Sequence, residues 1–134
     1  MKKTITIFLT VVCIIIAGFV WYRMPTQLLP GVKASDVSRI EVFDGNTGKG
    51  FDIDAGADIA RILDDLQSAT LRREGISLGH TGERFRLTFY DMNDKVLTHF
   101  TVNSETTIRR DPFFYRDSTD SLCVDVLEEL EAAA

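Results

Sequence analysis

Residues 83–103 read ERFRLTFYDMNDKVLTHFTVN, and this stretch predicts an antiparallel β-hairpin. In its first part, Phe85, Leu87 and Phe89 alternate with polar side chains, which is the period of a strand with one buried face. Residues 91–94 form a turn signal, because Asp and Asn side chains hydrogen-bond to the nearby backbone. The second part alternates again and places four side chains on one face: Val96, Thr98, Phe100 and Val102.

A second hairpin and a helix are predicted on the N-terminal side of this stretch. Residues 38–54 hold two alternating segments, and residues 44–50 between them are dense in Gly, Asp and Asn. The helix follows from apolar residues that recur at helical spacing and would bury one face. These residues are Ile59, Ile62, Leu63 and Leu66.

More strands are predicted on both sides of the central hairpin. Residues 70–73 are interpreted as a short strand, and residues 75–82 as a loop with three glycines. Residues 106–109 and 113–115 are predicted to form a further hairpin around Asp111-Pro112.

A last helix is expected over residues 118–131, with Ser118 or Thr119 as its N-cap. Its apolar positions at helical spacing are Leu122, Val126 and Leu130. The order of elements after the N-terminal segment is therefore ββαβββββα. This order predicts an α+β domain, in which two amphipathic helices cover one face of an antiparallel sheet and leave the other face wet.

The N-terminal segment is predicted to be an uncleaved transmembrane anchor. Residues 4–22 contain no charge, and a helix of that length spans roughly 28 Å, close to the hydrocarbon thickness of a bilayer. Trp21 and Tyr22 stand where an interfacial aromatic belt would lie. Lys2 and Lys3 outnumber Arg23, so the positive-inside tendency places the N-terminus in the cytoplasm.

Two other kinds of N-terminal segment fit less well. A cleaved signal peptide needs small residues before the cleavage site, and cleavage after Ala17 would put the large Ile15 at position −3. A lipoprotein signal needs small residues just before the lipidated cysteine, whereas two valines precede Cys13. The expected protein is therefore a single-pass protein of the cell membrane, with its domain outside the cytoplasm.

The chain is expected to divide into four parts. Residues 1–23 form the cytoplasmic tip and the anchor, and residues 24–37 form a linker that contains two prolines. Residues 38–131 form the extracytoplasmic domain, and residues 132–134 form a short tail.

Charge and cysteine content limit the classes of function that the chain can have. The chain has 20 acidic and 15 basic residues, and three of the basic ones flank the apolar segment. The rest of the chain is thus markedly acidic, which argues against nucleic-acid binding and against docking on anionic lipid headgroups. Cys13 lies in the membrane segment, so Cys123 has no disulfide partner in the domain and is interpreted as a small buried hydrophobe.

The chain resembles small membrane- or lipid-anchored extracytoplasmic domains of unknown function from Gram-positive bacteria. Some of these adopt a sheet-and-helix arrangement similar to one repeat of the TATA-binding protein. The segments that carry the resemblance are residues 40–42, 48–49, 59–66, 85–91, 113–115 and 127–130. Since such families have no established activity, the resemblance implies no catalytic residue, cofactor or partner.

Catalytic and metal motifs are incomplete in this sequence. Ser77 lies in a G-x-S-x-G pattern, but that pattern acts as a nucleophile elbow only between a core strand and a helix. Asp44 begins a segment like a calcium loop, yet Lys49 and Ala55 replace the glycine and glutamate that such a loop needs. Neither histidine has a second ligand at zinc-binding spacing. No metal or cofactor is therefore expected.

The remaining candidate is a binding surface on the open face of the sheet. Arg84, Arg86 and Tyr90 alternate with the core positions of their strand, and His99 points outward from the next strand. Arg and Tyr are enriched in recognition surfaces; the alternative is an ordinary solvated face. The leading hypothesis is a non-enzymatic binding module for an unidentified protein or cell-wall partner. The alternatives are a small serine hydrolase or transferase built on Ser77, and an anion-binding sensor.

Overall fold

The computed structural model describes residues 1–80, 82, 84–118 and 122–134 of the chain. Its helices are α1 (Lys2–Arg23), η1 (Ala34–Asp36, a 3₁₀ helix), α2 (Gly56–Ser68) and α3 (Val124–Ala133). Its strands are β1 (Val37–Asp44), β2 (Gly50–Ile53), β3 (Leu71–Ile76), β4 (Phe85–Asp91), β5 (Val96–Val102), β6 (Thr107–Arg110) and β7 (Phe113–Asp117).

The strands of the described chain form one sheet in the order β2-β1-β4-β5-β6-β7-β3. Every pair of neighbours in this sheet is antiparallel. The predicted hairpins are present as β1–β2, β4–β5 and β6–β7, so the antiparallel α+β class is confirmed. β4 lies inside the sheet, paired on one side with β1 and on the other with β5.

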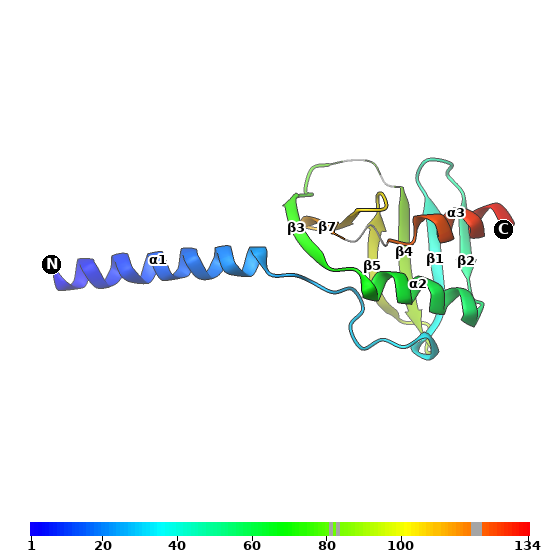
Figure 1. Ribbon diagram of the computed structural model, residues 1–134, viewed down its shortest axis with the longest axis horizontal. Helices are drawn as coiled ribbons and strands as arrows, with labels where there is room; N and C mark the ends of the chain where they lie inside the picture. Colours follow the sequence, from blue (N-terminus) through cyan, green and yellow to red (C-terminus); the bar gives the residue numbers. More distant parts are fainter. Residues whose placement is uncertain (81, 83, 119–121) are drawn as a thin grey trace.

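α2 and α3 lie over the same face of the sheet (Figure 1). The apolar stripe predicted for α2 is buried, and Leu127 of α3 belongs to the same core. The strands contribute alternate side chains to this core, and β4 contributes Phe85, Leu87 and Phe89, none of which is exposed. Cys123 is buried beside these side chains as predicted, and burial raises the pKa of its thiol to about 12.

The last helix begins at Val124, so its predicted start at residue 118 was wrong. β7 continues to Asp117, which is buried and pairs with Leu71 across the ladder. Ser118 follows as a bend, and Thr119 lies outside the described residues. Leu122, which the helical spacing had counted in the apolar stripe, is buried but lies before the first residue of the helix.

Two strand details also differ from the sequence prediction. β3 runs to Ile76, so the loop expected over residues 75–82 begins later. Val96 was expected on the core face but is exposed. The reason is a register shift between Phe89 and Tyr90 in the β4–β5 ladder, which breaks the alternation near the turn.

α1 is long and apolar enough to cross a membrane, judged by its length and composition. Its 22 residues span roughly 33 Å at the rise of an α-helix. Within residues 2–23, all of which are described, no side chain is buried.

The C-terminal end of α1 packs against β3 and β7. Arg73 Nη1 donates to the Trp21 carbonyl oxygen at 3.1 Å, and its guanidinium carbon lies 3.9 Å from the centroid of the Trp21 ring. The Gly75 amide donates to the Tyr22 hydroxyl at 2.9 Å. The ring of Phe113 meets those of Trp21 and Tyr22 in edge-on contacts at 6.1 and 5.6 Å.

The segment expected to be a linker, residues 24–37, is folded onto the domain. Thr26 and Leu71 exchange backbone hydrogen bonds of 2.7 and 3.1 Å, so the segment adds a bridge to the edge of β3. Gln67 of α2 donates through Nε2 to the Leu29 carbonyl oxygen at 2.8 Å, and the Leu29 side chain is buried. The domain is thus attached closely to the end of α1.

Replacing Leu66 by alanine should lower the free energy of unfolding by about 2–5 kcal/mol, because Leu66 is fully buried and its loss leaves a cavity. Leu97→Ala is the matched control; that side chain is 40 % exposed, and its loss should cost less than about 1 kcal/mol. Urea unfolding of the full chain in detergent micelles, followed by near-ultraviolet circular dichroism, measures both. Equal losses in the two variants would contradict the core described above.

Candidate binding surface on the open face of the sheet

One row of side chains crosses the sheet on the face turned away from α2 and α3, here called the open face. Phe43 pairs with Arg86, Arg86 with Thr101, Thr101 with Arg109, and Arg109 with Phe114. Five neighbouring strands therefore contribute one residue each. The row begins and ends with an aromatic residue, and the two arginines lie between them. The Arg86 guanidinium carbon lies 5.0 Å from the centroid of the Phe43 ring.

A groove of about 480 Å³ lies at the middle of this row, where Arg86, Thr101 and Arg109 line it. Its charged and titratable lining consists of Arg86, His99, Arg109, Arg110 and Asp111. Arg86, His99 and Arg110 are exposed, and Arg109 is half-buried. Cationic side chains outnumber the one carboxylate, so the groove is suited to anionic groups although the chain as a whole is acidic.

Asp111 is fixed at the end of the groove by two side chains. The Ser77 hydroxyl donates to Asp111 Oδ1 at 2.5 Å, and Arg109 Nε donates to the same oxygen at 3.1 Å. The hydrogen bond from Ser77 is the main reason why the pKa of Asp111 lies below its ordinary value of 3.8, and Arg109 and His99 act in the same direction. The carboxylate in turn fixes the orientation of the Arg109 guanidinium.

Ser77 has a structural role in this arrangement. It is fully buried, and its amide donates to the Pro112 carbonyl oxygen at 2.8 Å while its hydroxyl donates to Asp111. The ring of His80 packs edge-on against Phe114 at 5.2 Å. Since the Ser77 hydroxyl is buried and committed to a carboxylate, its geometry does not support a nucleophilic role.

Arg84 does not join Arg86 in the groove. Its Nη2 forms an ion pair of 2.9 Å with Glu128 of α3, and its Nε lies 3.7 Å from Asp44 Oδ1. Asp44 is almost fully buried. Burial favours its neutral form, but hydrogen bonds and the charge of Arg84 outweigh burial, so its pKa is lowered from 3.8. Arg84 therefore links the first hairpin to α3.

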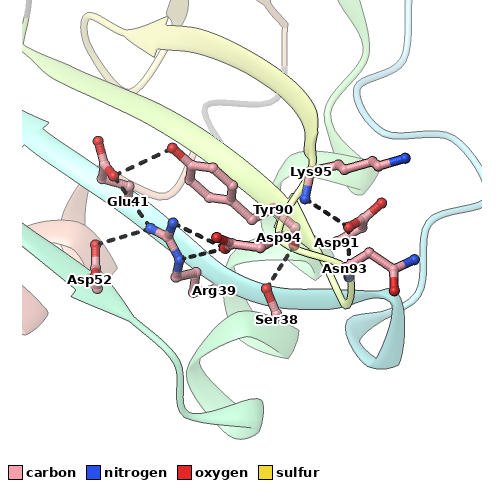
Figure 2. A network of polar contacts seen from close by, with 9 residues as sticks. All are labelled: Ser38, Arg39, Glu41, Asp52, Tyr90, Asp91, Asn93, Asp94 and Lys95. Carbon is pink, nitrogen blue, oxygen red and sulfur yellow. Dashed lines mark hydrogen bonds and ion pairs between the residues drawn. The ribbon is translucent and has the colours of Figure 1, made fainter.

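Tyr90 belongs to an ionic network at another part of the open face (Figure 2). The Arg39 guanidinium carbon lies 3.7 Å from the centroid of the Tyr90 ring. Arg39 also contacts Asp94 at 3.1 Å, Glu41 at 3.3 Å and Asp52 at 3.8 Å. The Tyr90 hydroxyl lies 3.5 Å from Glu41 Oε2. Tyr90 is therefore held by its own neighbours, in a region where carboxylates predominate.

Of the four residues predicted for the surface, the structure thus brings Arg86 and His99 together in the groove. Sequence reasoning missed Phe43, Arg109 and Asp111. A signal for Arg109 was present, because Ile108 is a core residue and its neighbour must point the other way. The order of the strands, which sets Arg109 close to Arg86, could not be inferred from alternation.

The comparisons with known proteins give no relative: no family model, no curated protein and no solved structure matches this chain.

Ser77→Ala should raise the pKa of Asp111 toward 3.8, because the hydroxyl makes the largest contribution to its lowering. A lowered pKa in the folded state stabilises the fold above the unfolded value, and this contribution is lost as the pH falls through the folded value. The stability difference between wild type and variant should therefore be largest above pH 3.8 and shrink in acid.

Carbon-13 NMR of the Asp111 carboxyl in micelles measures the first effect, and urea unfolding at several pH values measures the second. Ser68→Ala is the control, since Ser68 bonds to the Asp65 carbonyl oxygen on α2. An unchanged Asp111 titration in Ser77→Ala would show that the hydroxyl does not hold the carboxylate.

Proposed function

We propose that this chain is a membrane-anchored binding module that presents the open face of its sheet to a protein partner outside the cytoplasm. Three features support the anchor: the length of α1, its apolar composition, and the packing of its end against β3. The two lysines at its start and the positive-inside tendency favour a cytoplasmic N-terminus.

The observation that carries the proposal is the groove lined by Arg86, His99 and Arg109 on the open face. Arg side chains bind carboxylates through paired hydrogen bonds, and flanking aromatic rings add apolar contact area. We therefore infer a partner that presents acidic side chains. The buried Ser77 hydroxyl gives no comparable support to an enzymatic function.

The separation of positive and negative charge on the open face also favours one orientation of an approaching partner. The Arg39 network concentrates carboxylates at one part of the open face, whereas the groove concentrates cations at another. A partner with the complementary pattern would be attracted to the groove and repelled from the acidic region. Such a pattern contributes more to specificity and association rate than to affinity.

Arg86→Glu should strongly reduce capture of the partner while leaving the thermal stability nearly unchanged, because Arg86 is exposed. A photoreactive amino acid at Leu97, which lines the groove, would be crosslinked in intact cells to the partner. The measurement is the yield of the specific crosslinked product with and without Arg86→Glu.

Arg61→Glu is the matched control, since Arg61 lies on α2 and its ion pair with Glu129 at 3.3 Å is exposed and weak. A second control places the photoreactive group at Asp64 on the same helix. Equal yields from positions 97 and 64, or no loss with Arg86→Glu, would contradict a binding role for the open face. A product containing only a cell-wall polymer would contradict a protein partner.

A further inference from the structure

The edge of the domain nearest to α1 is β3. Figure 1 shows α1 leaving the domain on the β3 side, with β7, β5, β4, β1 and β2 following at increasing distance. This agrees with the strand order, in which β3 is the edge strand at the end opposite to β2. The hydrogen bond between the Gly75 amide and the Tyr22 hydroxyl brings the C-terminal part of β3 directly to the end of α1.

Two large apolar side chains project from this edge. Ile76 is 62 % exposed and Leu78 is 63 % exposed. Ser77 between them is buried and bonded through its backbone and its hydroxyl, so its neighbours are held outward. Ile76 follows Gly75 in the chain and pairs with Phe113 across the ladder. Gly75 and Phe113 both contact Tyr22 at the end of α1.

Aromatic side chains at that end of α1 are of the kind found at the boundary between a membrane and water. Trp21 and Tyr22 combine an apolar ring with a polar atom and favour the headgroup region. Arg72 donates through Nη1 to the Arg23 carbonyl oxygen at 3.2 Å, so a second cationic side chain of β3 reaches the helix end. Long cationic side chains can extend to the headgroup phosphates while their apolar stems stay buried.

We propose that Ile76 and Leu78 rest in the headgroup and upper acyl region of the bilayer, so that the domain stands on its β3 edge. This inference rests on the proposed function, in which α1 spans the membrane. A lipid surface is the occupant, because the two side chains continue the contact surface that starts at Trp21 and Tyr22. Burial of apolar area drives the contact, which is compatible with the acidic composition of the chain.

A domain that rests on its β3 edge holds the open face in a fixed direction relative to the membrane. The sheet runs edge-on from the bilayer, and its six strand spacings carry β2 roughly 29 Å away from β3. The groove at Arg86 and Arg109 then opens sideways, parallel to the membrane plane. A partner that is itself anchored in the same membrane would meet it by lateral diffusion.

Site-directed spin labelling of the full chain in phosphatidylcholine vesicles tests this contact. The wild-type chain carries a label at Cys13, since the buried Cys123 thiol has a pKa of about 12 and reacts slowly. Three further proteins carry Cys13→Ala together with Ile76→Cys, Leu78→Cys or Met92→Cys. Met92 is the apolar control, 68 % exposed in the turn after β4, which β5, β6 and β7 separate from β3.

Collisions of each label with oxygen, which concentrates in lipid, are compared with collisions with a water-soluble nickel complex. We expect the ratio at positions 76 and 78 to exceed that at position 92 several-fold and to lie below that at Cys13. Ratios at 76 and 78 equal to that at 92 would overturn the proposal while a lipid signal at Cys13 preserves the anchor. Labels at 76 and 78 shielded from both reagents would also overturn it, by showing a protein contact.

A water signal at Cys13 would instead refute the membrane anchor itself, and with it the proposed function. Addition of phosphatidylglycerol to the vesicles should change the ratios at 76 and 78 little, because apolar burial drives the contact. A contact formed only with the anionic lipid would overturn the apolar basis of the proposal.

Discussion

Burial of the alternate side chains of β4 is the constraint on which the rest of the structure depends. Phe85, Leu87 and Phe89 are fully buried beneath α2 and α3, while β1 and β5 pair with the strand on both sides. A slip of one residue in either ladder would turn these apolar side chains to water and bring polar side chains into the core. The same constraint therefore forces Arg86 outward, and the groove on the open face is a consequence of the core.

The elements with strong periodicity could be predicted from the sequence, and the remainder depended on distant partners. Alternation in β4 and helical spacing in α2 reflect burial of one face, and this pattern is visible in the sequence of each segment alone. The start of α3 could not be found in this way, because Leu122 is buried in the core although it lies before the helix, so its apolar spacing did not mark a helical turn. Arg84 and Tyr90 were predicted for the binding surface, but Arg84 pairs with Glu128 and Tyr90 contacts Arg39, and these partners lie far away in the sequence.

The charge of the whole chain gives little information about its candidate binding surface. A formal charge of −5 suggests an acidic protein, yet many carboxylates are engaged in local ion pairs or distributed over α2 and α3. Asp111 shows the effect most clearly, because it belongs to the groove and still orients the cation Arg109. The field that a partner meets close to the sheet is thus set by side chains within about one Debye length, roughly 8–10 Å.

A domain packed against the end of α1 differs in its freedom of orientation from a domain on a flexible tether. A free linker of ten or more residues would let the open face sample many directions, and each binding event would cost rotational freedom. Here Thr26 extends the edge of β3, Gln67 holds the Leu29 backbone, and Arg73 covers the Trp21 ring. The rotational freedom of the domain is therefore lost when the chain folds, and the burial of Leu29 offsets the cost of that loss. Under the proposed function, the groove would therefore be presented to a partner already oriented, which lowers the entropic cost of binding.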